Sequence, residues 1–257
     1  MKEEKLSGKT RVLPIIVLII IIALWVLVSQ LQLFPESEFP SPQSVVRGFG
    51  EEIKAGRLFD DLIASLFRVT TGFALAVVLG IPVGLLLGNH ARARRALLPT
   101  VNFFRNLSPL AWIPFAILWF GIGDRPAIFL IFMTSFFPIV LATIAAVASI
   151  PTVFFRVAEN YGYRGTELLT KVTLPAIAPQ VITALRIVAG LAWVVVVAAE
   201  MIAGRDGLGF AVWDSRNGLR LDLLVVNMIV IGFIGVVIDR LLLQLTKLPS
   251  LRWGYER

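Results

Sequence analysis

Cysteine is absent from the 257 residues, and histidine occurs once, as His90. The lack of cysteine excludes disulfides, thiolate metal ligands and a cysteine nucleophile, and a single histidine cannot build a histidine metal cluster. Charged residues are also scarce, at 16% against about 25% in soluble domains. Because 57% of the residues are hydrophobic, too few polar side chains remain to coat a soluble fold of this size. The composition therefore indicates an exterior that faces lipid.

Six apolar stretches are each long enough to cross the roughly 30 Å hydrocarbon core of a bilayer as a helix. We predict an all-α polytopic membrane protein with spans near Val12–Ser29, Leu66–Gly88, Leu97–Phe120, Ala127–Ala148, Val181–Ala203 and Leu221–Leu245. The first apolar run is too long for a signal peptide, so we predict a signal anchor. Gly80, Gly84 and Gly88 lie on one side of the second span and favour close helix packing. Pro109 and Pro114 are expected to break the third span.

The predicted organisation has four parts. Residues 1–30 form a short cytoplasmic segment and the first span, and residues 31–64 form a periplasmic or interfacial segment. Within the latter, proline-punctuated chain precedes a pair of amphipathic helices between residues 44 and 66. Residues 65–246 form the transmembrane core, which includes an amphipathic segment at 151–175, and residues 247–257 form a cytoplasmic tail.

The distribution of Lys and Arg predicts the orientation of these spans. Fourteen of the 24 basic residues lie in segments 1–11, 89–106, 149–180 and 247–257, whereas seven lie in segments 31–64, 122–125 and 204–220. The positive-inside rule therefore places both termini in the cytoplasm, and it explains the net charge of +7 without nucleic acid. This assignment treats 89–106 as cytoplasmic and leaves the third to fifth spans without Lys or Arg at mid-depth.

The segment from Pro151 to Pro175 has one apolar and one polar side at helical spacing. Gly162 and Gly165 interrupt its middle, where the backbone can bend or approach a partner closely. Two interpretations fit this pattern: a helix lying on lipid headgroups, or a docking helix for a cytoplasmic partner.

The second interpretation is supported by a family resemblance. Gly162, Val172, Leu174 and Pro175 match the coupling-helix motif of binding-protein-dependent ABC importer permeases, in which a glycine precedes a Leu-Pro ending. The motif's glutamate would fall at Arg156, with Glu159 three residues later. Five further stretches are similar to the nitrate, sulfonate, taurine and bicarbonate branch: Arg68–Phe73, Ser108–Pro114, Gly190–Trp193, Ala198–Met201 and Gly207–Phe210.

The resemblance implies the fold of a type I ABC importer permease, two copies of this chain or a close homologue forming one pathway, and a periplasmic or lipid-anchored binding protein. Two cytoplasmic ATPase subunits would use ATP and Mg²⁺, because this chain has no P-loop sequence. We therefore expect a transport subunit rather than an enzyme, with membrane lipid as its surroundings and no cofactor of its own. The expected coupling residues are Glu159, Tyr161, Gly162, Arg164, Gly165, Thr166, Leu174 and Pro175.

Candidate pathway residues are sparse in the spans. Glu200 would either form a gate with an arginine partner at the mouth of the pathway or lie at the membrane interface. Arg186 would attract an anion, extend its side chain to the headgroups or pair with a neighbouring loop. Trp112, Thr134, Ser135 and Trp193 could donate hydrogen bonds to a passing anion, or they could serve only helix packing.

The substrate expected from the resemblance is a small anion such as nitrate, bicarbonate or a sulfonate. A vitamin-precursor importer and a secondary, ion-gradient transporter are the alternatives. A secondary transporter would need carboxylates within the membrane, and only Glu200 and Asp239 could serve.

Overall fold

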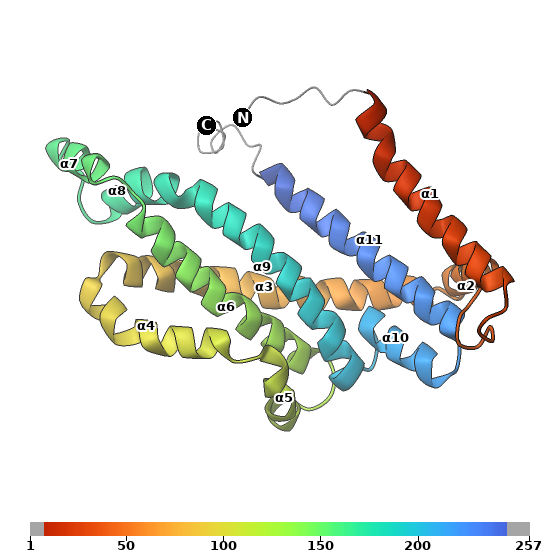
Figure 1. The fold of residues 1–257 in the computed structure, drawn as a ribbon. Coiled ribbons are helices and arrows are strands. Elements are labelled where there is room, and N and C mark those ends of the chain that lie inside the picture. The colour runs from red at the N-terminus through yellow and green to blue at the C-terminus, as the bar shows by residue number, and fades with distance from the viewer. Residues whose placement is uncertain (1–7, 246–257) are drawn as a thin grey trace.

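The computed structural model describes residues 8–245, and every regular element in that range is a helix (Figure 1). Five helices are long and apolar enough to cross a membrane: α1 (Gly8–Gln30), α3 (Arg57–Asn89), α6 (Asp124–Ala148), α9 (Leu174–Ala203) and α11 (Leu221–Leu245). The predicted all-α membrane fold is confirmed. The first seven residues and the predicted tail at 247–257 lie outside the described residues.

The predicted third span consists of separate pieces, α4 (Ala91–Asn106), the 3₁₀ turn η1 (Pro109–Trp112) and α5 (Ile113–Phe120). The helix stops at Leu107 and Ser108, whose backbones are extended. Pro109 is the cause, because a proline lacks the backbone N–H and its ring disfavours the helical conformation of the residue before it. None of these pieces would cross a membrane alone, so six apolar stretches give five continuous spans within residues 8–245.

The helix α4 starts six residues before Leu97, where the third span was expected to begin, and it includes most of the segment 89–106. The helix begins at Ala91, directly after α3 ends at Asn89, so His90 is the connection. The charges at Arg92, Arg94 and Arg95 occupy its first turn, where a helix tolerates them at the membrane surface. Arg105 consequently lies fourteen residues into the helix, about 21 Å from Ala91.

The core is built where α3 packs along α6 and α6 along α9. Glycines on α3 allow the first contact: a Cβ on Gly84 would lie 2.5 Å from the Thr143 Cβ, and one on Gly88 would lie 2.9 Å from the Val147 Cβ. Gly72 is equally tight, with the carbonyl oxygen of Ile128 at 2.8 Å from its Cβ position. The close packing expected from these glycines is confirmed.

One end of the bundle carries α7 (Thr152–Asn160) and α8 (Thr166–Leu168), and we call it the coupling end. The opposite end, which we call the distal end, carries α2 (Pro42–Ala55) and α10 (Leu208–Asn217) (Figure 1). Only the first helix of the predicted interfacial pair is separate. The second is the beginning of α3, which starts at Arg57 after Gly56 in the left-handed region (φ 75°).

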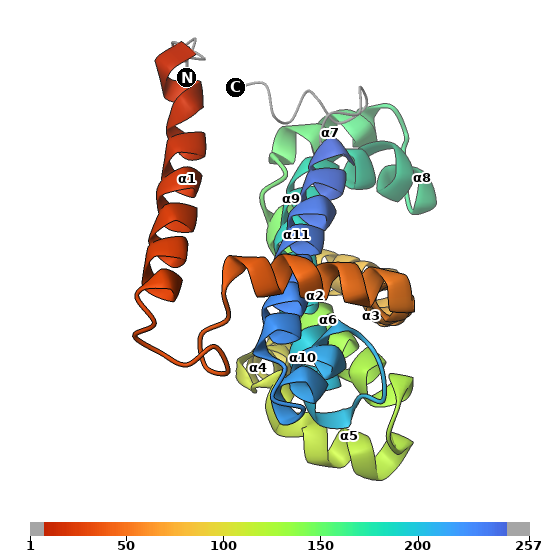
Figure 2. The ribbon, with the colours of Figure 1, turned by 90° about the vertical axis from the view of Figure 1, so that its right-hand side faces the viewer.

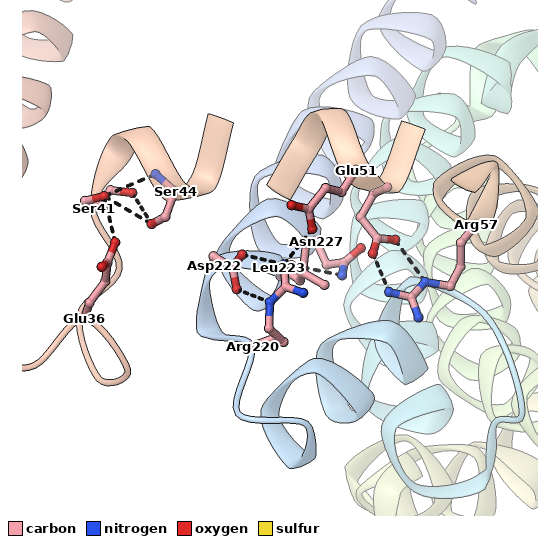
Figure 3. Close-up of polar contacts among 10 residues, drawn as sticks. Glu36, Ser41, Ser44, Glu51, Arg57, Arg220, Asp222, Leu223 and Asn227 are labelled. Carbon is pink, nitrogen blue, oxygen red and sulfur yellow. Dashed lines mark hydrogen bonds and ion pairs between the residues drawn. The ribbon is translucent and has the colours of Figure 1, made fainter. Parts of the chain in front are cut away.

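At the distal end α2 lies across α11, as Figure 2 shows. A Cβ on Gly48 would lie 2.9 Å from Leu223 Cδ2, so the contact is close. Arg220 Nη2 donates to Glu51 Oε2 and to Asp222 Oδ2, each at 2.8 Å, and thereby ties α2 to the start of α11 (Figure 3). The helix α1 stands apart from the bundle (Figure 2), and no side chain in its apolar window is buried.

Candidate coupling and translocation sites

The helix α7 presents an apolar surface at the coupling end. Val153, Phe154 and Val157 are each about half exposed, whereas Ala158 is buried. Large apolar side chains exposed together on a short helix favour a protein partner or lipid headgroups. Glu159 is exposed and forms no ion pair within residues 8–245.

The turn after α7 depends on its glycines. Gly162 (φ 78°) donates its N–H to the Glu159 carbonyl at 2.9 Å, and the Tyr163 N–H reaches the Ala158 carbonyl at 2.9 Å. This hydrogen-bond pattern is a Schellman motif, which needs a left-handed residue at the position of Gly162. Gly165 also has a positive φ (54°), so the chain changes direction a second time there. The two glycines leave Tyr161 76% exposed at the tip of the turn.

The chain returns to the bundle through α8 and the π-helical turn η2 (Leu169–Thr173), which continues directly into α9. Lys171 Nζ lies 2.9 Å from Glu167 Oε1 and 4.6 Å from the centre of the Tyr163 ring. Pro175 stands in the first turn of α9, where a missing N–H costs no helical hydrogen bond. Of the predicted coupling residues, Arg164 and Thr166 are exposed near the turn, while Leu174 is half-buried at the start of α9.

The distal end holds a buried ion pair between α3 and α9. Arg68 is 1% exposed and Glu200 is fully buried, and Arg68 Nη1 donates to Glu200 Oε1 at 2.8 Å. The other carboxylate oxygen of Glu200 accepts from Ser65 Oγ and from the Gly209 N–H, both at 2.9 Å. The arginine partner that the sequence suggested as one possibility for Glu200 is therefore present.

Arg68 also binds two exposed carboxylates. Its Nε donates to Asp124 Oδ1 at 2.7 Å, and its remaining contacts are the carboxylate and carbonyl of Asp206. Asp61 accepts the N–H of Gly207 at 2.7 Å, which fixes the loop before α10. Four elements thus meet at one guanidinium: α3, α6, α9 and the loop before α10. Sequence reasoning missed this role of Arg68, although an arginine and a carboxylate in two otherwise apolar spans are a signal for pairing.

Besides Glu200, three of the predicted pathway residues are buried within the single chain. Thr134 Oγ1 donates to the Leu130 carbonyl at 2.7 Å, and Trp193 Nε1 donates to the Ile231 carbonyl at 3.0 Å. Ser135 Oγ is buried without a hydrogen-bond partner among the described residues. Trp112 is half-buried among aromatic rings and lies 6.3 Å, ring centre to ring centre, from Phe104.

Arg186 and Asp239 form a two-pronged ion pair between α9 and α11, with distances of 2.6 and 2.7 Å. The guanidinium of Arg186 is therefore bound by a carboxylate of a neighbouring span and not by one of a neighbouring loop. Asp239 pairs across helices with Arg186 and not with its neighbour Arg240.

Comparison with known proteins places this architecture among membrane transport subunits. In solved structures, the chain is similar to a methionine ABC transporter, MetNI, in an inward-facing conformation, with a TM-score of 0.60, 22% identity and coverage of 72% of this chain and 94% of that chain. It is also similar to a bacterial alginate ABC transporter, with a TM-score of 0.61, 16% identity and coverage of 92% and 95%. At these identities the likeness establishes the fold.

Sequence relatives are more informative. The chain is 39% identical over 197 residues to a putative ABC transporter permease of Methanocaldococcus jannaschii, covering 76% of this chain and 74% of the relative. It is 38% identical to a bicarbonate transport system permease of Synechococcus elongatus, covering 74% and 69%. It is 34% identical to the taurine transport system permease of Escherichia coli, covering 86% and 82%. The family model described as binding-protein-dependent transport system inner membrane component matches residues 76–248. The chain belongs to this family and is the permease component of an ABC importer.

Proposed function

We propose that two copies of this chain, or one copy with a close homologue, form a pathway for a small anion delivered by a binding protein. Family membership implies the binding protein and a separate ATPase as partners. It also removes the secondary transporter from the alternatives. The observation that carries the proposal is the position of α9, which begins at the coupling segment and ends beside the buried Arg68–Glu200 pair.

The helix α9 can connect ATP hydrolysis to the distal end. Its 30 residues span about 45 Å, and it continues from the π-turn η2 without a break. An ATPase docked on Tyr161, the turn at Gly162 and Gly165, and the exposed side of α7 would displace the start of α9. The displacement would reach Glu200, which binds Arg68 on α3 and the N–H of Gly209 on α10. Movement of the hydrogen-bond network around Arg68 and Glu200 would then open or close the distal end of the pathway.

The relatives support the proposed substrate class. The names of two of them refer to bicarbonate and taurine, whose shared feature is a small group with negatively charged oxygens. The binding protein would provide most of the selectivity, and the permease would provide a polar passage that releases its cargo. A neutral vitamin precursor is the competing substrate.

The charge distribution supports an orientation with both termini and the coupling end in the cytoplasm. The distal end, with α2, α10 and the Arg68 network, would then face the periplasm and the binding protein. This orientation also places the exposed apolar side of α7 where an ATPase can reach it.

Uptake into proteoliposomes that contain the permease, the ATPase and the binding protein tests the proposal. We expect ATP-dependent uptake of at least one of nitrate, bicarbonate and taurine. Uptake of a neutral vitamin precursor with none of the three would contradict the anion assignment and leave the role as permease intact.

A further inference from the structure

Just before the break between α4 and α5, Arg105 is exposed, pairs with no carboxylate among residues 8–245, and lies level with the middle of the span α6. Phe104, next to Arg105, stacks on Phe137 of α6 with ring centres 5.4 Å apart and planes 10° apart. Phe137 lies close to the middle of the 25-residue span α6. Eleven residues separate it from Ala148, which corresponds to about 16 Å of helix. Arg105 therefore lies too deep for its side chain to reach the headgroups at the coupling end.

Arg105 differs from four other arginines that lie in or beside the spans. Arg57, Arg68, Arg186 and Arg220 each hold at least one carboxylate. Arg105 is exposed, and within residues 8–245 it takes part in no ion pair or side-chain hydrogen bond. An arginine exposed to the bilayer centre is unfavourable by at least about 2.5 kcal/mol, so such residues face a water-filled cavity or a partner.

Polar side chains surround Arg105, and no described residue forms a side-chain hydrogen bond with them. Asn102 and Asn106 lie three residues before it and one residue after it, on the same side of α4 by helical spacing. Ser108 follows in the extended break. Trp112 lies beyond the break and is placed beside this end of α4 by its contact with Phe104. No acidic side chain lies between residues 61 and 123, so the chain segment around Arg105 carries positive charge only.

We infer that Arg105, with Asn102, Asn106, Ser108 and Trp112, forms a contact site for an oxyanion inside the translocation pathway. The inference rests on the proposed function. It adds a fixed positive charge to a pathway whose other candidate hydrogen-bond donors are neutral. The guanidinium offers two parallel N–H groups that match two oxygens of a nitrate, bicarbonate or sulfonate group. Because Arg105 is exposed, water screens its attraction, and the anion is held weakly enough to leave.

Cysteine labelling tests the site without knowledge of the substrate, since the chain contains no cysteine. In the assembled complex with its ATPase, Asn106→Cys and Ser108→Cys should react with water-soluble thiosulfonates. The anionic reagent should react faster than the cationic one by about fourfold or more, and Arg105→Gln should abolish that preference. Leu18→Cys on the apolar helix α1 is the control and should stay unlabelled.

The inference is overturned if neither cysteine reacts with the water-soluble reagents, or if Arg105→Gln leaves the preference for the anionic reagent unchanged. Two positions are used so that a failure of one variant to assemble does not remove the test.

Uptake gives the second readout. Arg105→Gln should lower the maximal rate of ATP-dependent anion uptake about tenfold, because a charge-assisted hydrogen bond is lost. Arg105→Lys should retain part of the rate. Arg95→Gln, which removes an exposed charge in the first turns of the same helix, should transport normally. Wild-type uptake by Arg105→Gln would contradict the inference. If the wild-type complex moves no anion, the proposed substrate class is wrong, and the labelling preference alone decides whether the site attracts anions.

Discussion

Arg68 and Glu200 are 132 positions apart in the chain, and their buried side chains form an ion pair at 2.8 Å. Since three further groups bind the same guanidinium, the pair is the point at which α3, α6, α9 and the loop before α10 are held together. Its removal should have consequences for stability as well as transport.

We expect Arg68→Met to destabilise the permease by about 3–5 kcal/mol, because Glu200 would remain buried without a counter-charge. A lower thermal unfolding midpoint of the purified complex and a lower yield would report this loss. Arg186→Gln is the matched control, since it breaks a partly exposed pair between two spans and should lower the midpoint less. Equal midpoints for the Arg68 variant and the wild type would contradict the structural role of the pair.

The glycines of α3 should be sensitive to a single methyl group. A Cβ on Gly84 would approach the Thr143 Cβ to 2.5 Å and the Val140 carbonyl to 2.9 Å. Gly84→Ala should therefore cost about 1–3 kcal/mol through separation of α3 from α6. Gly190→Ala is the control, because no atom lies within 4 Å of its Cβ position. Thermal unfolding should distinguish the two, and a Gly84 variant as stable as the Gly190 variant would count against close packing.

At the coupling end, we expect Gly162 to be sensitive to substitution because of its backbone conformation and not because of close packing. Nothing lies within 4 Å of a Cβ on Gly162, so a side chain would meet open space, but the φ of 78° is unfavourable for L-residues. Gly162→Leu should distort the turn at a cost of about 1–2 kcal/mol and reduce co-purification of the ATPase. Gly162→Asn should bind more ATPase than the leucine variant, because asparagine tolerates this conformation. Wild-type recovery of the ATPase with Gly162→Leu would contradict docking at this turn.

The orientation can be tested with two exposed residues at opposite ends. Tyr161 is 76% exposed at the coupling end, and Leu219 is 78% exposed in the turn between α10 and α11. In intact cells, a membrane-impermeant thiol reagent should label Leu219→Cys, and it should label Tyr161→Cys only after the membrane is opened. Reporter fusions after Pro42 and after Gly207 should both indicate the periplasm. The reverse labelling pattern would overturn the proposed topology.

Apolar runs and proline positions were sufficient to predict most of the fold. The runs located the spans because helices in lipid must be apolar over about 20 residues, and Pro109 located the break in the third span. The start of α4 was misassigned because Arg92, Arg94 and Arg95 have the composition of a loop, although they occupy one helical turn.

The sequence predicted only part of the candidate coupling and translocation sites. The glycines at 162 and 165 and the Leu-Pro ending predicted the coupling segment, because a local turn depends on local residues. The Arg68–Glu200 pair depends on the packing of α3 against α9, which no local pattern specifies. The depth of Arg105 became visible only from the stacking of Phe104 on Phe137.

The π-turn at Leu169–Thr173 makes the length of the coupling segment as important as its composition. A π-turn accommodates one residue more than an α-helical turn, and each residue advances an α-helix by about 100° and 1.5 Å. Deleting one residue there could restore regular helix, yet it would swing the turn at Gly162 to a different side of the bundle. An ATPase surface shaped for the present angle would then meet the wrong side chains, even with every coupling residue retained.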